Sequence, residues 1–178
     1  MGKKEIVFKT PWFEIESEEF DDVPALGGKP MYRMNVPPSV MAIVFTLEGK
    51  LILVRQFRPA QGKYTVEVPT GYMDKNETPE RAVEREFREE TGYRCDEWQL
   101  VSKNPLGVDR INGEISIFLG RQASSDPSFQ REDGMEVLIA SWDEVKTLAL
   151  KGELGSLWVL GALALVKWKF SPPELQNF

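Results

Sequence analysis

The order of apolar and polar residues divides the chain into short extended segments and a few helical ones. Apolar residues that alternate with polar ones, or form β-branched runs between turn residues, predict β-strands. The predicted strands cover residues 6–9, 13–16, 31–36, 40–47, 50–57, 64–68, 97–101, 115–119 and 136–140. Apolar residues at helical spacing predict helices over residues 79–91, 142–150 and 157–169. This order of elements predicts an α/β or α+β fold in which helices flank a sheet.

The first third of the chain differs from the remainder because its strands are short and polar connections separate them. Residues 17–30 form a connection that contains glycine and proline, and Pro37 and Pro38 end the third predicted strand. We therefore expect an N-terminal β extension over residues 1–38 and a main domain over residues 39–178. A chain of 178 residues is long enough for one domain with a substantial core, and short for two.

The helix over residues 79–91 has clear start and stop signals. Thr78 is a suitable N-cap, Pro79 suits the first helical position, and Glu80 places an acid at the positive end of the helix dipole. Gly92 suits the position just after the last helical residue. These signals fix which side chains of the helix share a face.

Three glutamates lie together on this helix, beside its apolar flank. At 100° per residue, Glu86, Glu89 and Glu90 fall within an arc of about 100°. Acids at this spacing repel one another, so we expect a positive group against them. One interpretation is a solvated acidic face. The other interpretation is a site for Mg²⁺ or Mn²⁺, because these hard cations bind carboxylate oxygens together with substrate phosphates. The loop before the helix favours this second interpretation, because Gly71 and Glu77 place a tight turn and a further acid there.

Composition narrows the chemistry. The formal net charge is −6 and the isoelectric point about 4.9, which argues against binding to nucleic acid or to an anionic membrane surface. The sequence has no histidine, which removes Ser-His and Cys-His catalysis and imidazole zinc sites. Its single cysteine, Cys95, suits a reducing compartment. With no apolar targeting run at the amino terminus and no apolar stretch long enough to span a bilayer, we expect a cytoplasmic protein.

The helix and the loop before it resemble the signature of the Nudix hydrolase family. That signature is glycine, five residues, glutamate, seven residues, then R-E-apolar-x-E-E-x-G-apolar. The matching residues are Gly71, Glu77, Arg85, Glu86, Phe87, Glu89, Glu90, Gly92 and Tyr93. The resemblance implies the family's α/β/α sandwich with a mixed sheet, and a metal-dependent hydrolase of phosphoanhydrides.

The same resemblance implies roles for individual residues. Glu86 and Glu90 are expected to be the principal metal ligands. Glu89 is expected to be a further ligand or the catalytic group that orients water, and the carbonyl oxygen of Thr70 another ligand. Arg85 is expected to orient the carboxylates, and Glu77, named above with the loop, to brace that loop on the helix.

Residues 54–71 carry a second resemblance, to the Nudix branch that cleaves ADP-ribose and other nucleoside diphosphate sugars. The shared pattern is V-x-Q-F/Y-R-P followed by E-x-P-x-G. By this resemblance, Arg55 and Arg58 are expected near the diphosphate and Glu67 near the terminal ribose or sugar. Arginine offers a planar fork of donors to phosphate oxygens. The alternative is that both arginines are solvated residues at a strand end.

Members of that branch commonly supply another acid from a loop before the last strand. Here the loop covers residues 129–136, and Glu132 and Asp133 are the candidates for a catalytic base or an additional ligand, with Glu136 left open. Members selective for ADP-ribose usually carry a proline further beyond the signature than Pro105 is here. We therefore predict the wider substrate class.

The predicted activity is metal-dependent hydrolysis of a nucleoside diphosphate sugar, such as ADP-ribose or GDP-mannose, to a nucleoside monophosphate and a sugar phosphate. Two alternatives are a Nudix hydrolase of nucleoside triphosphates or dinucleoside polyphosphates, and a non-catalytic module that binds a nucleotide sugar. The resemblance also implies a homodimer in which the N-terminal extension packs on a second subunit. Alternatively, its aromatic residues, such as Trp12 and Tyr32, close the chain's own core.

Overall fold

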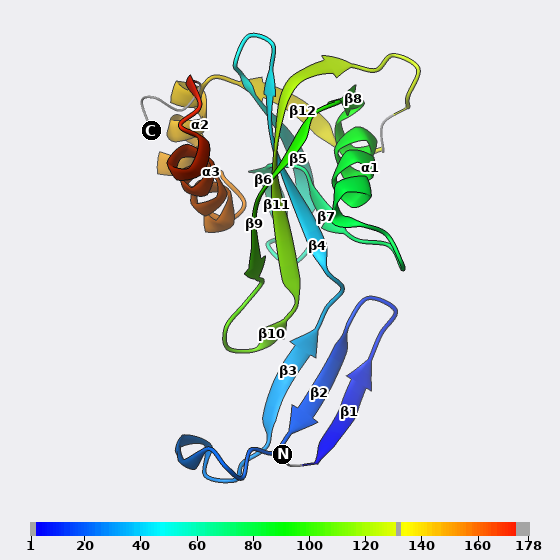
Figure 1. The fold of residues 1–178 in the computed structure, drawn as a ribbon, viewed down its shortest axis with the longest axis vertical. Helices are drawn as coiled ribbons and strands as arrows, with labels where there is room; N and C mark the ends of the chain where they lie inside the picture. The colour runs from blue at the N-terminus through cyan, green and yellow to red at the C-terminus, as the bar shows by residue number, and fades with distance from the viewer. Residues whose placement is uncertain (1–2, 131–132, 174–178) are drawn as a thin grey trace. The chain divides into compact units, whose positions relative to one another are not determined.

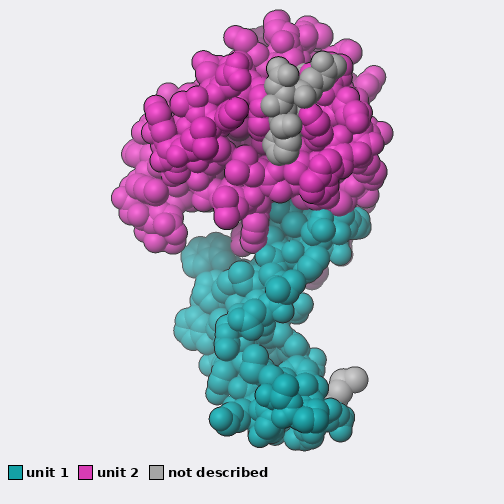
Figure 2. All heavy atoms as spheres, turned by 90° about the vertical axis from the view of Figure 1, so that its left-hand side faces the viewer, with its two compact units in different colours: residues 1–39, 103–115 teal, residues 40–102, 116–178 magenta. Residues whose placement is uncertain are grey.

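The structure is a computed structural model that describes residues 3–130 and 133–173. The chain divides into two compact units, coloured separately in Figure 2. The first unit contains residues 1–39 and 103–115, and the second contains residues 40–102 and 116–178. Residues 103–115 thus group with the N-terminal segment, and the division into an extension over residues 1–38 and a main domain over residues 39–178 stays a prediction.

The first unit contains a sheet. Its strands are β1 (Lys4–Lys9), β2 (Glu14–Glu18), β3 (Met31–Asn35) and β10 (Ile111–Asn112), in the order β1-β2-β3-β10. The strands β1, β2 and β3 are antiparallel, and β10 pairs in parallel with β3. A 3-10 helix, η1 (Pro24–Leu26), lies in the connection between β2 and β3. This confirms the three predicted N-terminal strands.

Charged side chains crosslink the strands of this sheet. Glu18 is only 4% exposed, and its carboxylate pairs with Lys4 on β1 and Arg33 on β3. Glu16 also pairs with Arg33. Large apolar side chains of the same unit remain exposed, with Phe8 at 55% and Trp12 at 71%.

A larger mixed sheet and the helices belong to the second unit. Among the described residues this sheet has the strand order β12-β5-β4-β11-β8, with β6 paired to β5, β7 to β4 and β9 to β11. The strands are β4 (Ser39–Thr46), β5 (Leu51–Arg58), β6 (Lys63–Glu67), β7 (Thr70–Tyr72), β8 (Tyr93–Arg94), β9 (Trp98–Pro105), β11 (Glu114–Ser125) and β12 (Glu136–Ala140).

Helices cover both faces of this sheet, as Figure 1 shows. Helix α1 (Pro79–Thr91) lies on one side, and α2 (Trp142–Leu150) and α3 (Leu157–Phe170) lie on the other. The predicted α/β/α sandwich is thereby confirmed. Within the described residues, no helix combines the length and apolar character needed to cross a membrane.

The core explains why α1 is held in place. Strand β4 is buried along its whole length, and α1 presents Ala82, Val83 and Phe87 to it. The Phe87 ring meets the Trp98 ring edge to face, with centroids 5.5 Å apart. Burying a side chain of this size stabilises the fold by about 2–3 kcal/mol. The apolar flank of α1 thus fixes the position of the glutamates beside it.

Two strands extend beyond their predicted limits. Strand β11 continues to Ser125, although the apolar run ends at Leu119. Strand β9 ends at Pro105, and β10 occupies part of the segment 104–113, which the sequence suggested was a loop. In both cases backbone pairing with a neighbouring strand continues where the side chains become polar, so the apolar pattern gives no sign of it.

Candidate active site

Local signals in the sequence form α1 as expected. The Thr78 hydroxyl accepts a hydrogen bond from the backbone N–H of Arg81, and Pro79 occupies the first turn. Gly92 ends the helix with φ 70°, and its N–H donates to the carbonyl oxygen of Arg88. Because that φ is left-handed, glycine is the residue that adopts it without strain. The orientation of the three glutamates follows from these ends.

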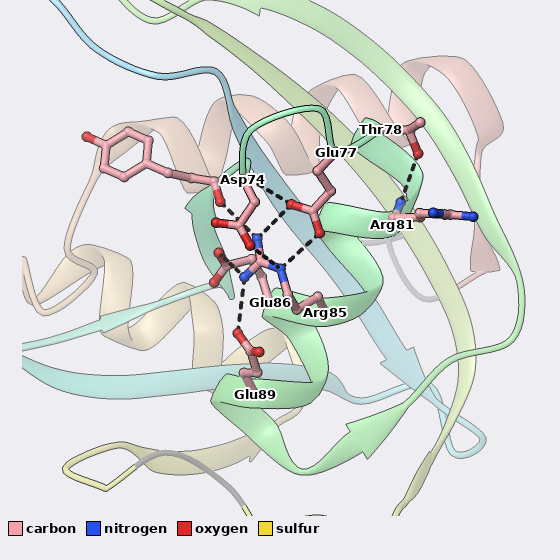
Figure 3. Close-up of polar contacts among 8 residues, drawn as sticks. Asp74, Glu77, Thr78, Arg81, Arg85, Glu86 and Glu89 are labelled. Atoms are coloured by element: carbon pink, nitrogen blue, oxygen red, sulfur yellow. Dashed lines mark hydrogen bonds and ion pairs between the residues drawn. The ribbon is translucent and has the colours of Figure 1, made fainter. Parts of the chain in front are cut away.

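Arg85 holds the acidic groups of the signature together (Figure 3). Its Nε and Nη2 donate to the two carboxylate oxygens of Glu77 at 2.9 and 2.8 Å, and Nη2 also donates to the carbonyl oxygen of Tyr72 at 3.0 Å. Its Nη1 donates to Glu86 at 2.8 Å and to Glu89 at 3.1 Å. Arg85 is therefore a positive group against these acids, and the hydrogen bonds, first of all those to Glu77, raise its pKa.

Glu77 connects the loop before the helix to the helix itself. One of its carboxylate oxygens also accepts the backbone N–H of Asp74 at 2.9 Å. The hydrogen bonds from Arg85 outweigh the effect of burial and lower the pKa of Glu77. Glu77 therefore stays ionised and braces the loop, as the signature implied.

The two glutamates that were predicted as principal metal ligands, Glu86 and Glu90, contact strand β7. Glu90 is 4% exposed, and its Oε2 accepts the backbone N–H of Thr70 at 3.2 Å. The carboxylate of Glu86 lies against Gly71, where an added Cβ would be 2.0 Å from Cδ of Glu86. No other residue type fits there without moving Glu86. The first glycine of the signature is thus explained by a close approach between strand and helix.

These groups have the chemistry of a site for a hard divalent cation. Glu86, Glu89, Glu90 and the Thr70 carbonyl offer only oxygen donors, which Mg²⁺ and Mn²⁺ prefer. Across residues 3–130 and 133–173, no three acidic, histidine or cysteine side chains are already gathered closely enough to hold a metal ion. The donors fit such an ion in kind, and Nη1 of Arg85 lies between two of them, since it donates to one oxygen of Glu86 and to one oxygen of Glu89.

On the neighbouring hairpin, Arg58 and Glu67 pair with each other. Nε of Arg58 donates to Oε1 of Glu67 at 2.8 Å, and Nη2 donates to Oε2. The hydroxyl of Thr65, which is 4% exposed, also donates to Oε1. Burial alone would raise the pKa of Glu67, but the hydrogen bonds from Arg58 and Thr65 outweigh it and hold that pKa low.

The Arg58–Glu67 pair is electrostatically coupled to the signature. The hydrogen bonds to Glu67 raise the pKa of Arg58 most, and the charge of Glu90 contributes as well. Two residues that were predicted to bind substrate are therefore paired. The arginine of that pair also interacts electrostatically with Glu90, a predicted metal ligand. Thr65 was not among the predicted site residues, although its position two residues before Glu67 places it on the same face of β6.

Arg55 lies on the opposite face of the same hairpin. Strand residues alternate between faces, and the register pairs Arg55 with Val66 but Gln56 with Thr65. Arg55 donates to Glu136 at 3.1 Å, and its guanidinium lies 4.5 Å from the centre of the Tyr64 ring. The two arginines that were predicted near the diphosphate are thus not brought together. A role for Arg55 in binding substrate stays a prediction.

The acidic loop contains two of the predicted catalytic residues. Glu132 lies outside the described residues, and Asp133 is exposed. Glu136, the residue left open, begins β12 and pairs with Arg55. The segment just before the loop is anchored to α1, because Arg88 donates to Asp126 at 2.8 Å. The catalytic roles assigned to Glu132 and Asp133 stay predictions.

Comparison with known proteins identifies the class of protein. The family model of the NUDIX domain matches residues 36–157, which is more than half of the 178 residues. The chain therefore belongs to the Nudix family. Nudix hydrolases generally use divalent metal ions.

Several curated proteins resemble part of the chain. ADP-ribose pyrophosphatase of Bacillus subtilis (strain 168) is 43% identical over 109 residues, which cover 58% of this chain and 57% of that protein. Methanol dehydrogenase activator of Bacillus methanolicus is 37% identical over 98 residues, covering 52% of this chain and 53% of that protein. The matches therefore span only about half the length of these relatives.

A solved structure resembles the whole fold. The crystal structure of an ADP compounds hydrolase superposes with a TM-score of 0.76 over 95% of this chain and 92% of that chain. The two sequences are 18% identical, so this likeness shows the fold alone.

Proposed function

We propose that the protein is a metal-dependent diphosphatase. It hydrolyses a nucleoside diphosphate sugar, such as ADP-ribose or GDP-mannose, to a nucleoside monophosphate and a sugar phosphate. The observation that carries the proposal is the juxtaposition of two groups. The carboxylates of α1 lie around Arg85, and Arg58, held by Glu67, is close enough to Glu90 for their charges to interact.

Membership in the Nudix family and the relatives support the reaction class. An ADP-ribose pyrophosphatase is 43% identical over 109 residues, which cover 58% of this chain. An acidic protein needs locally concentrated cations to bind a diphosphate. Arg58 offers such a cation beside the signature, and a bound metal ion would offer another.

The residues divide the work between metal and substrate. Glu86, Glu89, Glu90 and the Thr70 carbonyl would hold Mg²⁺ or Mn²⁺. When bound, such an ion supplies positive charge against the diphosphate and activates water. Arg85 keeps the carboxylates on the side of the helix that faces β7, and Arg58 binds the diphosphate by its guanidinium.

Product analysis tests the proposal directly. The purified protein is incubated with ADP-ribose, GDP-mannose, other nucleotide sugars, nucleoside triphosphates and dinucleoside polyphosphates, in Mg²⁺, in Mn²⁺ and in excess chelator. We expect a nucleoside monophosphate and a sugar phosphate to form only when metal is present. When the reaction is run in oxygen-18 water, the product that carries the label shows which phosphorus is attacked. Cleavage confined to triphosphates or dinucleoside polyphosphates contradicts the substrate class. A nucleotide sugar that binds with metal and is recovered intact contradicts enzyme activity.

We further propose a homodimer that forms through the N-terminal β unit. Within that unit Phe8 and Trp12 expose apolar surface, and Tyr32 is 47% exposed. Apolar surface of this kind typically marks a protein interface. Light scattering across a concentration series tests the proposal, because Trp12→Ala and Phe8→Ala together should give a monomer, whereas an unchanged mass contradicts it.

A cytoplasmic location stays a prediction, and the buried free thiol of Cys95 suits it.

A further inference from the structure

The carboxylate of Glu67 accepts hydrogen bonds from two side chains, Arg58 and Thr65. The Thr65 hydroxyl and Nε of Arg58 donate to the same oxygen, Oε1, while Nη2 of Arg58 donates to the other. Because Thr65 is 4% exposed, its hydroxyl has little access to water and depends on Glu67 as its acceptor. The carboxylate is thus fixed in the orientation that grips the guanidinium.

A distant segment of the chain closes the other side of Glu67. Residues 153–155 run beside β6, where the N–H of Val66 donates to the carbonyl oxygen of Glu153 at 3.1 Å and the N–H of Gly155 donates to the carbonyl oxygen of Val66 at 2.8 Å. These two bonds form a parallel bridge between Val66 and Leu154. Backbone pairing therefore places Gly155 against the side chain of Glu67.

Gly155 leaves no room for a larger residue. A Cβ at this position would lie 2.7 Å from Cγ, 2.9 Å from Oε1 and 3.0 Å from Cδ of Glu67. The side chain of Glu67 cannot easily give way, because Arg58 and Thr65 hold its far end. The backbone of Gly155 is not in the left-handed region, so a substitution there acts through the contact with Glu67.

We propose that Thr65 and Gly155 are positioning residues that act through Glu67 to hold the guanidinium of Arg58 toward the diphosphate. This inference rests on the proposed function, since it assigns how the same site binds its substrate. Thr65 orients the carboxylate by a hydrogen bond, and Gly155 allows it to stay there. Neither residue touches the reacting atoms.

Kinetics of matched variants test the proposal. Thr65→Val removes the hydroxyl at nearly constant shape, and we expect KM for the cleaved nucleotide sugar to rise about tenfold while kcat changes less than about twofold, because the lost binding is uniform. Thr65→Ser restores the donor and should restore KM. Gly155→Ala should raise KM similarly. An unchanged KM in Thr65→Val or Gly155→Ala overturns the proposal.

Gly161→Ala is the matched control for Gly155→Ala. Nothing lies within 4 Å of an added Cβ at Gly161, which is exposed on α3, so this variant should keep the wild-type KM. A rise in KM for Gly161→Ala equal to that for Gly155→Ala would mean that alanine anywhere in this region disturbs binding. That result would overturn the role of the Glu67 contact.

A second readout does not depend on activity. Nitrogen-15 NMR follows exchange of the Arg58 Nε–H, identified by its loss in Arg58→Lys, and this proton should exchange slowly because Glu67 accepts it. Faster exchange in Thr65→Val and Gly155→Ala, with wild-type exchange in Thr65→Ser, supports the positioning role even if no nucleotide sugar is cleaved. Unchanged exchange overturns it. An inactive wild-type protein contradicts only the proposed function.

Discussion

The network around Arg85 and the network around Glu67 differ in how far apart their members lie in the sequence. Arg85 binds Tyr72, Glu77, Glu86 and Glu89, all within one turn-and-helix segment. Glu67 depends on Arg58 and Thr65 from its own hairpin, and on space left by residue 155. The proposed catalytic side is thus organised locally, and the proposed substrate side is organised by the tertiary fold.

The largest effect is expected from the buried glutamate of the local network. In Glu90→Gln we expect kcat/KM to fall about a thousandfold, because a lost metal ligand removes several kcal/mol of transition-state stabilisation. Glu84→Gln on the exposed side of α1 is the matched control and should keep wild-type activity. Steady-state kinetics at saturating metal measures both. Activity in Glu90→Gln within a few fold of wild type contradicts the role assigned to Glu90.

A smaller effect is expected from the arginine at the centre of that network. Arg85→Lys keeps the charge but loses the fork that reaches four partners, so kcat should fall about ten- to a hundredfold, as for other groups that orient metal ligands. Arg81→Lys, on an exposed position of the same helix, should change kcat little. If urea unfolding shows that Arg85→Lys lowers stability while kcat is retained, the arginine serves only the fold.

The two faces of the β5–β6 hairpin provide a sharper comparison. Arg58→Lys should raise KM about tenfold, because it breaks the paired hydrogen bonds to Glu67 and removes the fork for phosphate. Arg55→Lys should raise KM less, because Arg55 lies on the other face with Glu136 and Tyr64. KM values measured side by side decide the matter. Equal increases would mean that both arginines contact substrate.

The smallest effect concerns stability in acid. Arg85 lowers the pKa of Glu77 below its ordinary value of 4.5, so the unfolded chain binds the proton more readily than the folded one. The stability that Glu77 contributes is therefore complete above about pH 5 and is lost as the pH falls through the lowered folded value. Urea midpoints measured from about pH 6 to 3 should fall less steeply in Glu77→Gln than in wild type. Parallel curves would contradict this.

The signature and its helix could be predicted because their determinants are close in sequence. Thr78 and Gly92 mark the ends of α1, and the spacing of the glutamates shows that they share a face. The spacing also predicted a positive group against the glutamates, and the resemblance implied the roles of Arg85 and Glu77. Helices on both faces of a mixed sheet also followed from the order of elements and from the resemblance.

The pairing of strands and the partners across them could not be predicted. Period-two alternation already indicates that Arg55 and Arg58 point to opposite faces, but the second resemblance favoured placing both near the diphosphate. Nothing in the sequence indicates that residue 155 meets Glu67, because a bridge between β6 and a segment after α2 is set by the whole fold. The continuation of β11 to Ser125 was hidden for the same reason.

The contact between Gly155 and Glu67 has an evolutionary consequence. Substitutions at positions 65 and 155 can accumulate while the segment from Gly71 to Tyr93 stays identical, since neither position belongs to it. Lineages that share the same signature can then diverge in how firmly they hold the diphosphate. Grouping such proteins by the signature would sort them by their metal chemistry, and grouping them by the pair at 65 and 155 would sort them by how tightly they bind the diphosphate.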